Sequence, residues 1–107
     1  MNATSTNQDP NASPLPPLVL EEVLLGISNG TRWRILKELS RGGRQVIEIC
    51  ELLSMKSTNV SKHMRVLRLT GLVKVSRAGV YFVPPEYLVQ AGVIDYGHCL
   101  LRLDAGA

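Results

Sequence analysis

Apolar residues recur at helical spacing near the start of the folded part of the chain. Val19, Val23 and Ile27 are four residues apart within residues 18–28, and leucines flank them. This spacing predicts a short helix that is apolar over more than half of its circumference. We expect such a helix to be buried on two sides, and its extra apolar surface is typical of a subunit interface.

A second helix is predicted to follow Asn29, a residue type that favours the N-cap position. Its apolar residues Ile35, Leu36 and Leu39 have helical spacing and should face a core. The glycine pair at 42–43 should end it. Its cations are expected on the outer face: Arg32, Arg34, Lys37 and Arg41.

The third apolar pattern is shorter and leads into a tight turn. Val46, Ile49 and Leu53 form an apolar stripe within residues 44–54, which predicts a short helix. Residues 54–56 then form a three-residue turn.

The next segment predicts an amphipathic helix with a basic outer face. Ser57 is the expected N-cap, and Gly71 is expected to end the helix. At 100° per residue, Val60, Met64 and Leu67 face the core. The outer face is polar: Thr58, Lys62 and Arg65 point directly away, Asn59 and Ser61 flank them, and His63 lies at the boundary.

The apolar pattern then changes to one typical of strands. Residues 72–76 and 80–83 are rich in β-branched and aromatic residues, and the intervening turn has Gly79 available for positive φ. These features predict a β-hairpin with Arg77 at its tip. Residues 86–90 predict one helical turn, and residues 92–103, interrupted by Gly97, favour an extended segment over a helix.

Composition and charge refine this picture. A chain of 107 residues is one domain, and its polar, proline-rich residues 1–17 predict a flexible tail ahead of a folded domain over 18–107. The net charge of +3 is unevenly distributed: residues 32–77 carry +8, while the preceding segment carries −3 and the following segment −2. No acidic residue lies between Lys56 and Arg77. Such a basic middle is typical of polyanion binding, whereas a solvated surface helix would have mixed charges.

The order of these elements is that of a helix-turn-helix followed by a wing. The fold class expected is therefore mainly α with a small β-hairpin, a winged helix-turn-helix. The major groove of DNA admits one helix, which needs short polar residues near its N-terminus and cations around them. The expected DNA-binding residues are Lys56, Ser57, Thr58, Asn59, Ser61, Lys62, His63, Arg65, Arg68 and Arg77.

Residues 27–83 resemble the ArsR/SmtB type of winged-helix repressor. The matching residues are Thr31, Arg32, Ile35, Leu36, Leu39, Ser57, Val60, Ser61, His63, Met64, Leu67, Gly71, Leu72, Val73, Gly79 and Tyr81. The chain departs from the pattern at Gly30, where proline is usual, and at Thr70, where alanine is usual. The resemblance implies a homodimer that binds a pseudo-palindromic operator and releases it when an inducer binds. It also implies that Ser61 and His63 hold phosphates or brace the helix.

Metal chemistry is the weaker part of this resemblance. Where many relatives carry a thiolate pair, this chain has Gln45 and Ile47, and Cys50 is expected to pack in the core. Asp95, His98 and Cys99 are the remaining candidate ligands, and Cys99 is also a candidate reactive thiol. Neighbouring residues of a strand point to opposite faces, however, so His98 and Cys99 would not bind one ion together. We expect no metal and no cofactor.

The sequence contains no nucleophile–base pair, phosphate-binding glycine loop or catalytic carboxylate pair, so an enzyme is not expected. It shows no signal peptide and no membrane-spanning segment, and two cysteines suit the cytoplasm. The leading hypothesis is a dimeric, sequence-specific DNA-binding repressor, dimeric through its first helix and C-terminal segment. Two alternatives stay open: a winged-helix module that binds another protein, and a metal or thiol sensor.

Overall fold

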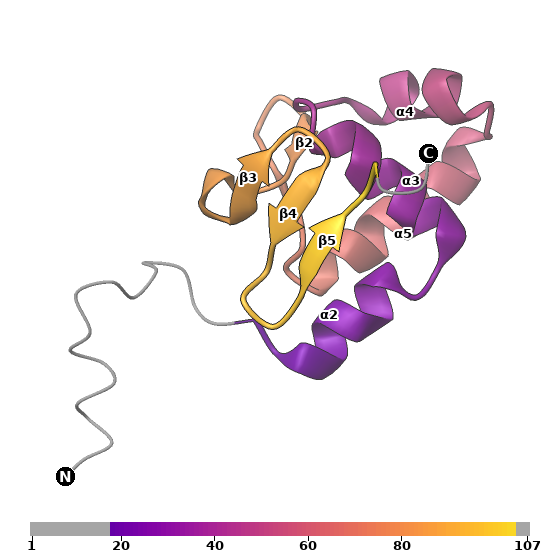
Figure 1. Cartoon of the computed structure of the whole chain (residues 1–107). Helices are drawn as coiled ribbons and strands as arrows, with labels where there is room; N and C mark the ends of the chain where they lie inside the picture. The colour runs from indigo at the N-terminus through magenta and orange to yellow at the C-terminus, as the bar shows by residue number, and fades with distance from the viewer. Residues whose placement is uncertain (1–17, 105–107) are drawn as a thin grey trace, which may run out of the picture.

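A computed structural model describes residues 18–104. The predicted tail over residues 1–17 lies outside this range. Four helices come first: α2 (Leu20–Ile27), α3 (Gly30–Leu39), α4 (Val46–Leu53) and α5 (Ser57–Leu69). They are followed by β1 (Lys74–Val75), β2 (Tyr81–Phe82), the 3-10 turn η1 (Pro85–Tyr87), β3 (Leu88–Gln90), β4 (Val93–Asp95) and β5 (Leu100–Arg102) (Figure 1). The predicted winged helix-turn-helix is confirmed, with one more sheet than expected.

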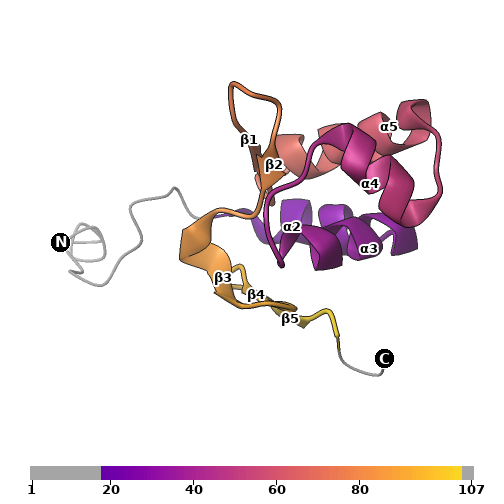
Figure 2. The same cartoon turned by 90° about the horizontal axis from the view of Figure 1, so that it is seen from above.

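The elements are arranged in layers around a core of leucine, isoleucine and valine. Figure 2 shows the three-stranded sheet on one side of α2 and α3, and α4 and α5 on the other. Val46 of the predicted α4 stripe is only partly buried. The other core side chains predicted for α3, α4 and α5 are at most 6% exposed: Ile35, Leu36, Leu39, Ile49, Leu53, Val60, Met64 and Leu67. The apolar spacing therefore identified the buried face of α3, α4 and α5 correctly.

Helix α3 begins as the sequence predicts. The Asn29 side-chain oxygen Oδ1 accepts hydrogen bonds from the backbone N–H groups of Thr31, at 2.8 Å, and Arg32, at 3.1 Å. These bonds satisfy two of the N–H groups that the first turn of a helix leaves without partners. Asn29 thereby fixes the point at which the chain turns from α2 into α3.

Helix α2 differs from the expectation that it would be buried on two sides. Only Val23 and Gly26 of this helix are buried. A Cβ atom at Gly26 would overlap the buried Leu72 side chain, so glycine permits α2 to lie close to the end of α5. Ile27 is partly buried against the core. Four apolar side chains at the start and along the outer side of α2 face solvent in the single chain: Val19, Leu20, Leu24 and Leu25 are 40–57% exposed.

The turn between α4 and α5 is confirmed, but the predicted N-cap is wrong by one residue. Ser54 has the left-handed conformation, with φ 53°, that ends α4. Lys56, not Ser57, is the N-cap of α5, because Lys56 is extended while Ser57 is already helical. The Lys56 carbonyl accepts from the N–H groups of Asn59 and Val60. A serine before a helix predicts a cap from its side chain, whereas here the backbone geometry of the turn sets the start.

The predicted hairpin is present and is joined to the helical part. Strands β1 and β2 pair antiparallel, and the Gly79 N–H donates to the Ser76 carbonyl at 3.0 Å across the turn. Gly79 has the predicted positive φ, 81°. Arg44, between α3 and α4, exchanges two backbone hydrogen bonds with Tyr81 of β2 at 2.8 and 2.9 Å. The hairpin is therefore fixed to the connection that precedes the helix-turn-helix.

The C-terminal segment is extended, as favoured, but it forms a sheet of its own. Strands β3, β4 and β5 pair antiparallel in that order, separately from β1 and β2. The helical turn expected over residues 86–90 is wrong in its second half, since only Pro85–Tyr87 is helical and Leu88–Gln90 is a strand. Ile94 and Leu101, paired across β4 and β5, are buried in the core.

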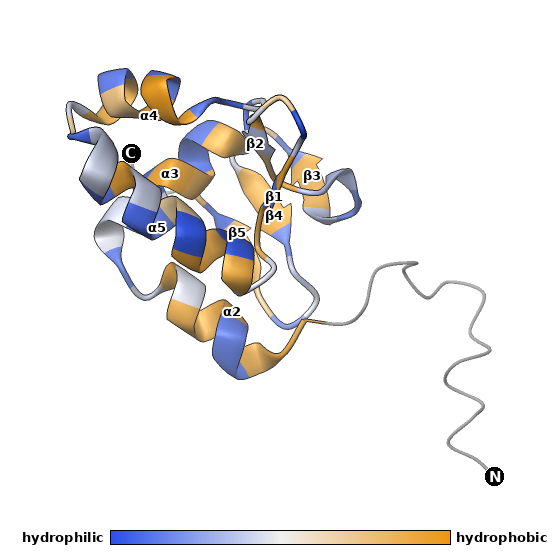
Figure 3. Ribbon diagram, turned by 180° about the vertical axis from the view of Figure 1, so that it is seen from behind, coloured by the Kyte–Doolittle hydropathy of each residue, from blue (hydrophilic) through white to orange (hydrophobic). Residues whose placement is uncertain are grey.

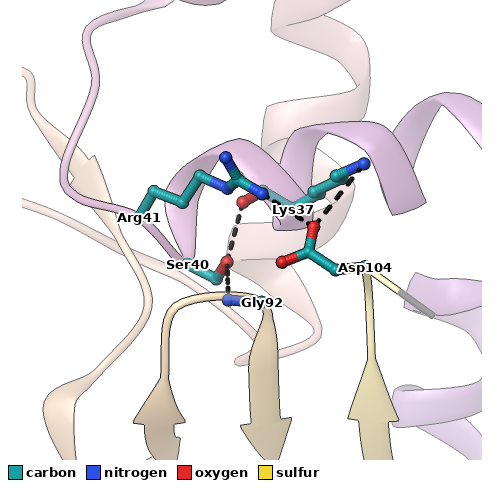
Figure 4. Close-up of polar contacts among 5 residues, drawn as sticks. All are labelled: Lys37, Ser40, Arg41, Gly92 and Asp104. Carbon is teal, nitrogen blue, oxygen red and sulfur yellow. Dashed lines mark hydrogen bonds and ion pairs between the residues drawn. The ribbon is translucent and has the colours of Figure 1, made fainter. Parts of the chain in front are cut away.

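Polar contacts hold this sheet against the end of α3 (Figure 4). The Ser40 hydroxyl accepts from the buried Gly92 N–H at 2.9 Å and donates to the Lys37 carbonyl at 2.7 Å. Arg41 and Lys37 pair with the Asp104 carboxylate at 2.8 and 3.6 Å. One buried hydrogen bond and one exposed ion-pair cluster thus join the two parts.

These two contacts should differ in their contribution to stability. Ser40→Ala is expected to lower the free energy of unfolding by about 1–3 kcal/mol, because it leaves the buried Gly92 N–H without an acceptor. Asp104→Ala removes ion pairs whose side chains are partly exposed, and should cost less than about 1 kcal/mol. Urea unfolding of both variants measures this, and equal losses would contradict the assignment of the hydroxyl as the stronger contact.

Candidate nucleic-acid interface

The outer face of α5 is polar, basic and open to solvent. Val60, Met64 and Leu67 are fully buried on its inner side. The other predicted contact residues of this helix are all exposed: Ser57, Thr58, Asn59, Ser61, Lys62, Arg65 and Arg68. In Figure 3, blue and pale segments of α5 alternate with orange ones, as expected of an amphipathic helix. These exposed side chains lie around the part of α5 that does not face the core, and His63 alone among the predicted residues of this helix is partly buried.

The N-terminal end of α5 adds positive potential to that face. Lys56 is exposed at the N-cap, and its side chain makes no capping hydrogen bond. The first turn of a helix carries N–H groups without intrahelical partners and a partial positive charge. Lys56 and Lys62 thus add their charges to those of the helix end.

The hairpin supplies a second basic element. Arg77 is exposed in the turn between β1 and β2, and Lys74 is exposed on β1. The Gln45 side chain donates to the Ala78 carbonyl at 3.2 Å, which holds the turn near the start of α4. In Figure 2 the hairpin projects on the same side as α5, away from the three-stranded sheet.

His63 lies partly buried and is turned toward α3. Its ring nitrogen Nδ1 is 3.2 Å from Nη1 of Arg32. Burial, and then the positive charge of Arg32, hold the pKa of His63 below its usual value. His63 thus contacts α3 through its Nδ1 side, and its role at a DNA surface stays a prediction.

The contacts of Arg32 could not be predicted from the sequence pattern. Its position predicted an outward-facing cation, but it is half-buried and makes three contacts. Besides His63, it donates from Nε to the Gly26 carbonyl at 2.9 Å and from Nη2 to the Leu25 carbonyl at 3.1 Å. Helical periodicity gives the direction of a side chain, not the presence of free carbonyl groups at the end of the previous helix.

The candidate metal ligands lie in and beside the turn between β4 and β5. The Asp95 carboxylate accepts from the Gly97 N–H at 2.8 Å, His98 is exposed, and Cys99 is partly buried against the core. Within residues 18–104, no three His, Cys, Asp or Glu side chains are grouped to hold a metal ion. Cys50 is partly buried and packs against the core from α4.

No helix within the described range is long and apolar enough to cross a membrane.

Comparisons with known proteins agree with this geometry. Residues 29–75 match the family model of bacterial regulatory proteins of the arsR family. No curated protein matches the chain. Among solved structures, the chain is similar to the homodimeric winged helix-turn-helix DNA-binding domain (fragment 1–100) of Mb0332 from Mycobacterium bovis, described as a possible ArsR-family transcriptional regulator. The two are 26% identical, with a TM-score of 0.59 over 80% of this chain and 74% of that one. Over residues 29–75 the chain thus matches the arsR-family model, within a winged helix-turn-helix fold.

Proposed function

We propose that this chain is a sequence-specific DNA-binding transcription regulator that acts as a homodimeric repressor on a pseudo-palindromic operator. The observation that carries the proposal is the outer face of α5. All exposed side chains from Ser57 to Arg68 are polar or basic, and the exposed Leu69 follows them at the end of the helix. A helix of this kind fits the major groove, and its inner face is anchored in the core. The family match and the similar DNA-binding domain support the same function.

The roles proposed for the side chains follow from length and charge. Thr58, Asn59, Ser61 and Lys62 lie in the first turns of α5, where side chains of a recognition helix reach base edges. Arg65 and Arg68 are long cations further along the helix and are assigned to phosphates. Lys56 and Ser57, at the start of α5, are assigned to the DNA backbone. Arg77 of the hairpin is assigned to the minor groove or its phosphates.

The homodimer is proposed to form through α2. This helix exposes Leu20 and Leu24, which lie one turn apart, together with Val19 and Leu25. A short apolar helix of this kind gains stability when a second copy covers it. The similar Mycobacterium bovis domain is described as homodimeric. A symmetric dimer places two copies of α5 about one DNA turn apart, roughly 34 Å.

Selection of DNA by the purified full chain tests the proposal. A pool of random-sequence duplexes is bound and amplified over several rounds, and the enriched sequences are read. We expect an inverted repeat with half-sites about one helical turn apart. Enrichment of no sequence, together with capture of another protein in a salt-insensitive complex, would favour the protein-binding alternative.

Asn59 should contribute to sequence preference. Asn59→Ala is expected to reduce the discrimination between the selected duplex and one changed at a single half-site base, by an amount on the order of 1–3 kcal/mol. Binding to unrelated duplexes should stay the same, because an amide carries no charge for phosphates. Competition binding measures both, and an unchanged preference would show that Asn59 does not reach a base.

A further inference from the structure

Three elements meet at the Arg32 side chain. Arg32 belongs to α3, the carbonyl groups of Leu25 and Gly26 belong to α2, and His63 belongs to α5. The guanidinium contacts all three partners at 2.9–3.2 Å. Helix α2 is the proposed dimer helix and α5 the proposed recognition helix. Arg32 therefore lies on a direct polar connection between the surface that would meet a second copy and the surface that would meet DNA.

The chemistry of this connection fixes the state of the histidine. A guanidinium has N–H donors and no acceptor, so Nδ1 of His63 must be the acceptor. The imidazole is then neutral, with its proton on Nε2. The ring thus presents one donor, Nε2–H, and its Nδ1 is occupied by Arg32.

We propose that Arg32 is a positioning residue that sets the placement of the recognition helix α5 relative to α2, by holding both the end of α2 and the neutral ring of His63. The DNA-binding part of this inference rests on the proposed function. Contact with three separate acceptors suits arginine in particular, because its planar guanidinium directs several N–H donors at fixed angles, whereas a lysine ammonium is a single point.

Protonation of His63 should undo the connection, since an imidazolium has no acceptor and repels the guanidinium. The pKa of His63 lies below the usual 6.5 in the folded chain, so the unfolded chain takes up this proton first as the pH falls. The connection is then complete above about pH 6.5 and is lost as the pH falls through the folded pKa. Of the charged groups on the helices packed against α5, Arg32 of α3 is the one that shifts His63; within the described residues no group of α4 contributes.

Imidazole NMR on the full chain tests the connection without DNA. Long-range ¹H–¹⁵N spectra of the wild type are expected to show His63 as the Nε2–H tautomer at pH 7.5. In Arg32→Gln the pKa of His63 should rise and the tautomer preference weaken, and Arg32→Lys should restore the lowered pKa in part. Arg34→Gln is the matched control, since it removes the same charge from an exposed position on the same helix and should leave His63 unchanged.

A DNA arm tests the positioning role with the duplex that the wild type selects. Arg32→Gln is expected to bind it roughly tenfold more weakly than Arg34→Gln does, with an unchanged slope of affinity against salt. If Arg32 instead held a phosphate, the slope would fall by about one unit.

Each arm can overturn the inference. A proton on Nδ1 in the wild type, or a His63 titration unaffected by Arg32→Gln, would show that the connection is absent in solution. Equal affinities of the Arg32→Gln and Arg34→Gln variants, or a reduced salt slope, would remove the positioning role. If the wild type selects no duplex, the proposed function fails, while the NMR arm still decides whether Arg32 joins α2 to α5.

Discussion

Lys62→Glu is expected to lower the affinity for the selected duplex on the order of 100-fold. The substitution removes one cation from the acid-free outer face of α5 and places a negative charge where the DNA surface would lie. Because Lys62 is exposed, the helix has no packing to lose there, and the thermal midpoint should stay close to that of the wild type. Fluorescence anisotropy with the labelled duplex at fixed salt measures the loss.

Arg102→Glu provides the matched control for this charge reversal. Arg102 is exposed on β5, in the sheet that lies on the opposite side of α2 and α3 from α5 (Figure 2). Arg102→Glu changes the net charge by the same amount as Lys62→Glu. A general electrostatic effect would therefore weaken DNA binding by both variants equally. A loss confined to Lys62→Glu supports a direct contact, and equal losses would contradict the placement of α5 in the groove.

Leu20→Glu combined with Leu24→Glu is expected to convert a dimer into a monomer. Both side chains are exposed in the single chain and lie one turn apart on α2. Burying two carboxylates against their symmetry copies is unfavourable, so the interface should not form. A monomer contacts only one half-site, and its affinity for the full inverted repeat should fall by at least about 100-fold.

Analytical ultracentrifugation gives the mass, and the same binding assay gives the affinity. Ile47→Glu is the control, because Ile47 is also exposed and apolar, but lies on α4. It should leave the mass unchanged. A double variant that remains dimeric would place the interface elsewhere, and a monomeric wild type that binds the inverted repeat would contradict the dimer.

The helical part of the fold could be predicted because the spacing of its apolar residues matches the turn of a helix that packs one face against a core. Val60, Met64 and Leu67 recur at the spacing that puts one face of α5 in the core, and all three are buried. Asn29 caps α3 and Gly79 turns the hairpin, since each residue type fits a backbone geometry that few others adopt as well. Local preference and burial agree at these positions.

Other features depend on partners distant in sequence and could not be predicted. The sequence of residues 92–103 favours an extended segment but does not give its partners, because the pairing of β4 with β3 and β5 depends on the buried contacts of Ile94 and Leu101. The apolar residues around α2 predict burial on two sides, whereas in one chain only Val23 and Gly26 are buried and Ile27 is partly covered. The role of Arg32 depends on carbonyl groups and a histidine that only the folded chain brings together.

Salt dependence of binding to the selected duplex tests most directly whether α5 lies against DNA. We assume about six phosphate contacts per subunit. The logarithm of the affinity should then fall against the logarithm of the salt concentration with a slope near −5 for each subunit that binds DNA. This slope corresponds to a loss of at least roughly 10³-fold between 50 and 200 mM salt. Lys62→Glu and Arg65→Ala should each reduce that slope. An affinity that is nearly constant across this range, in the wild type and in both variants, would contradict DNA recognition by α5.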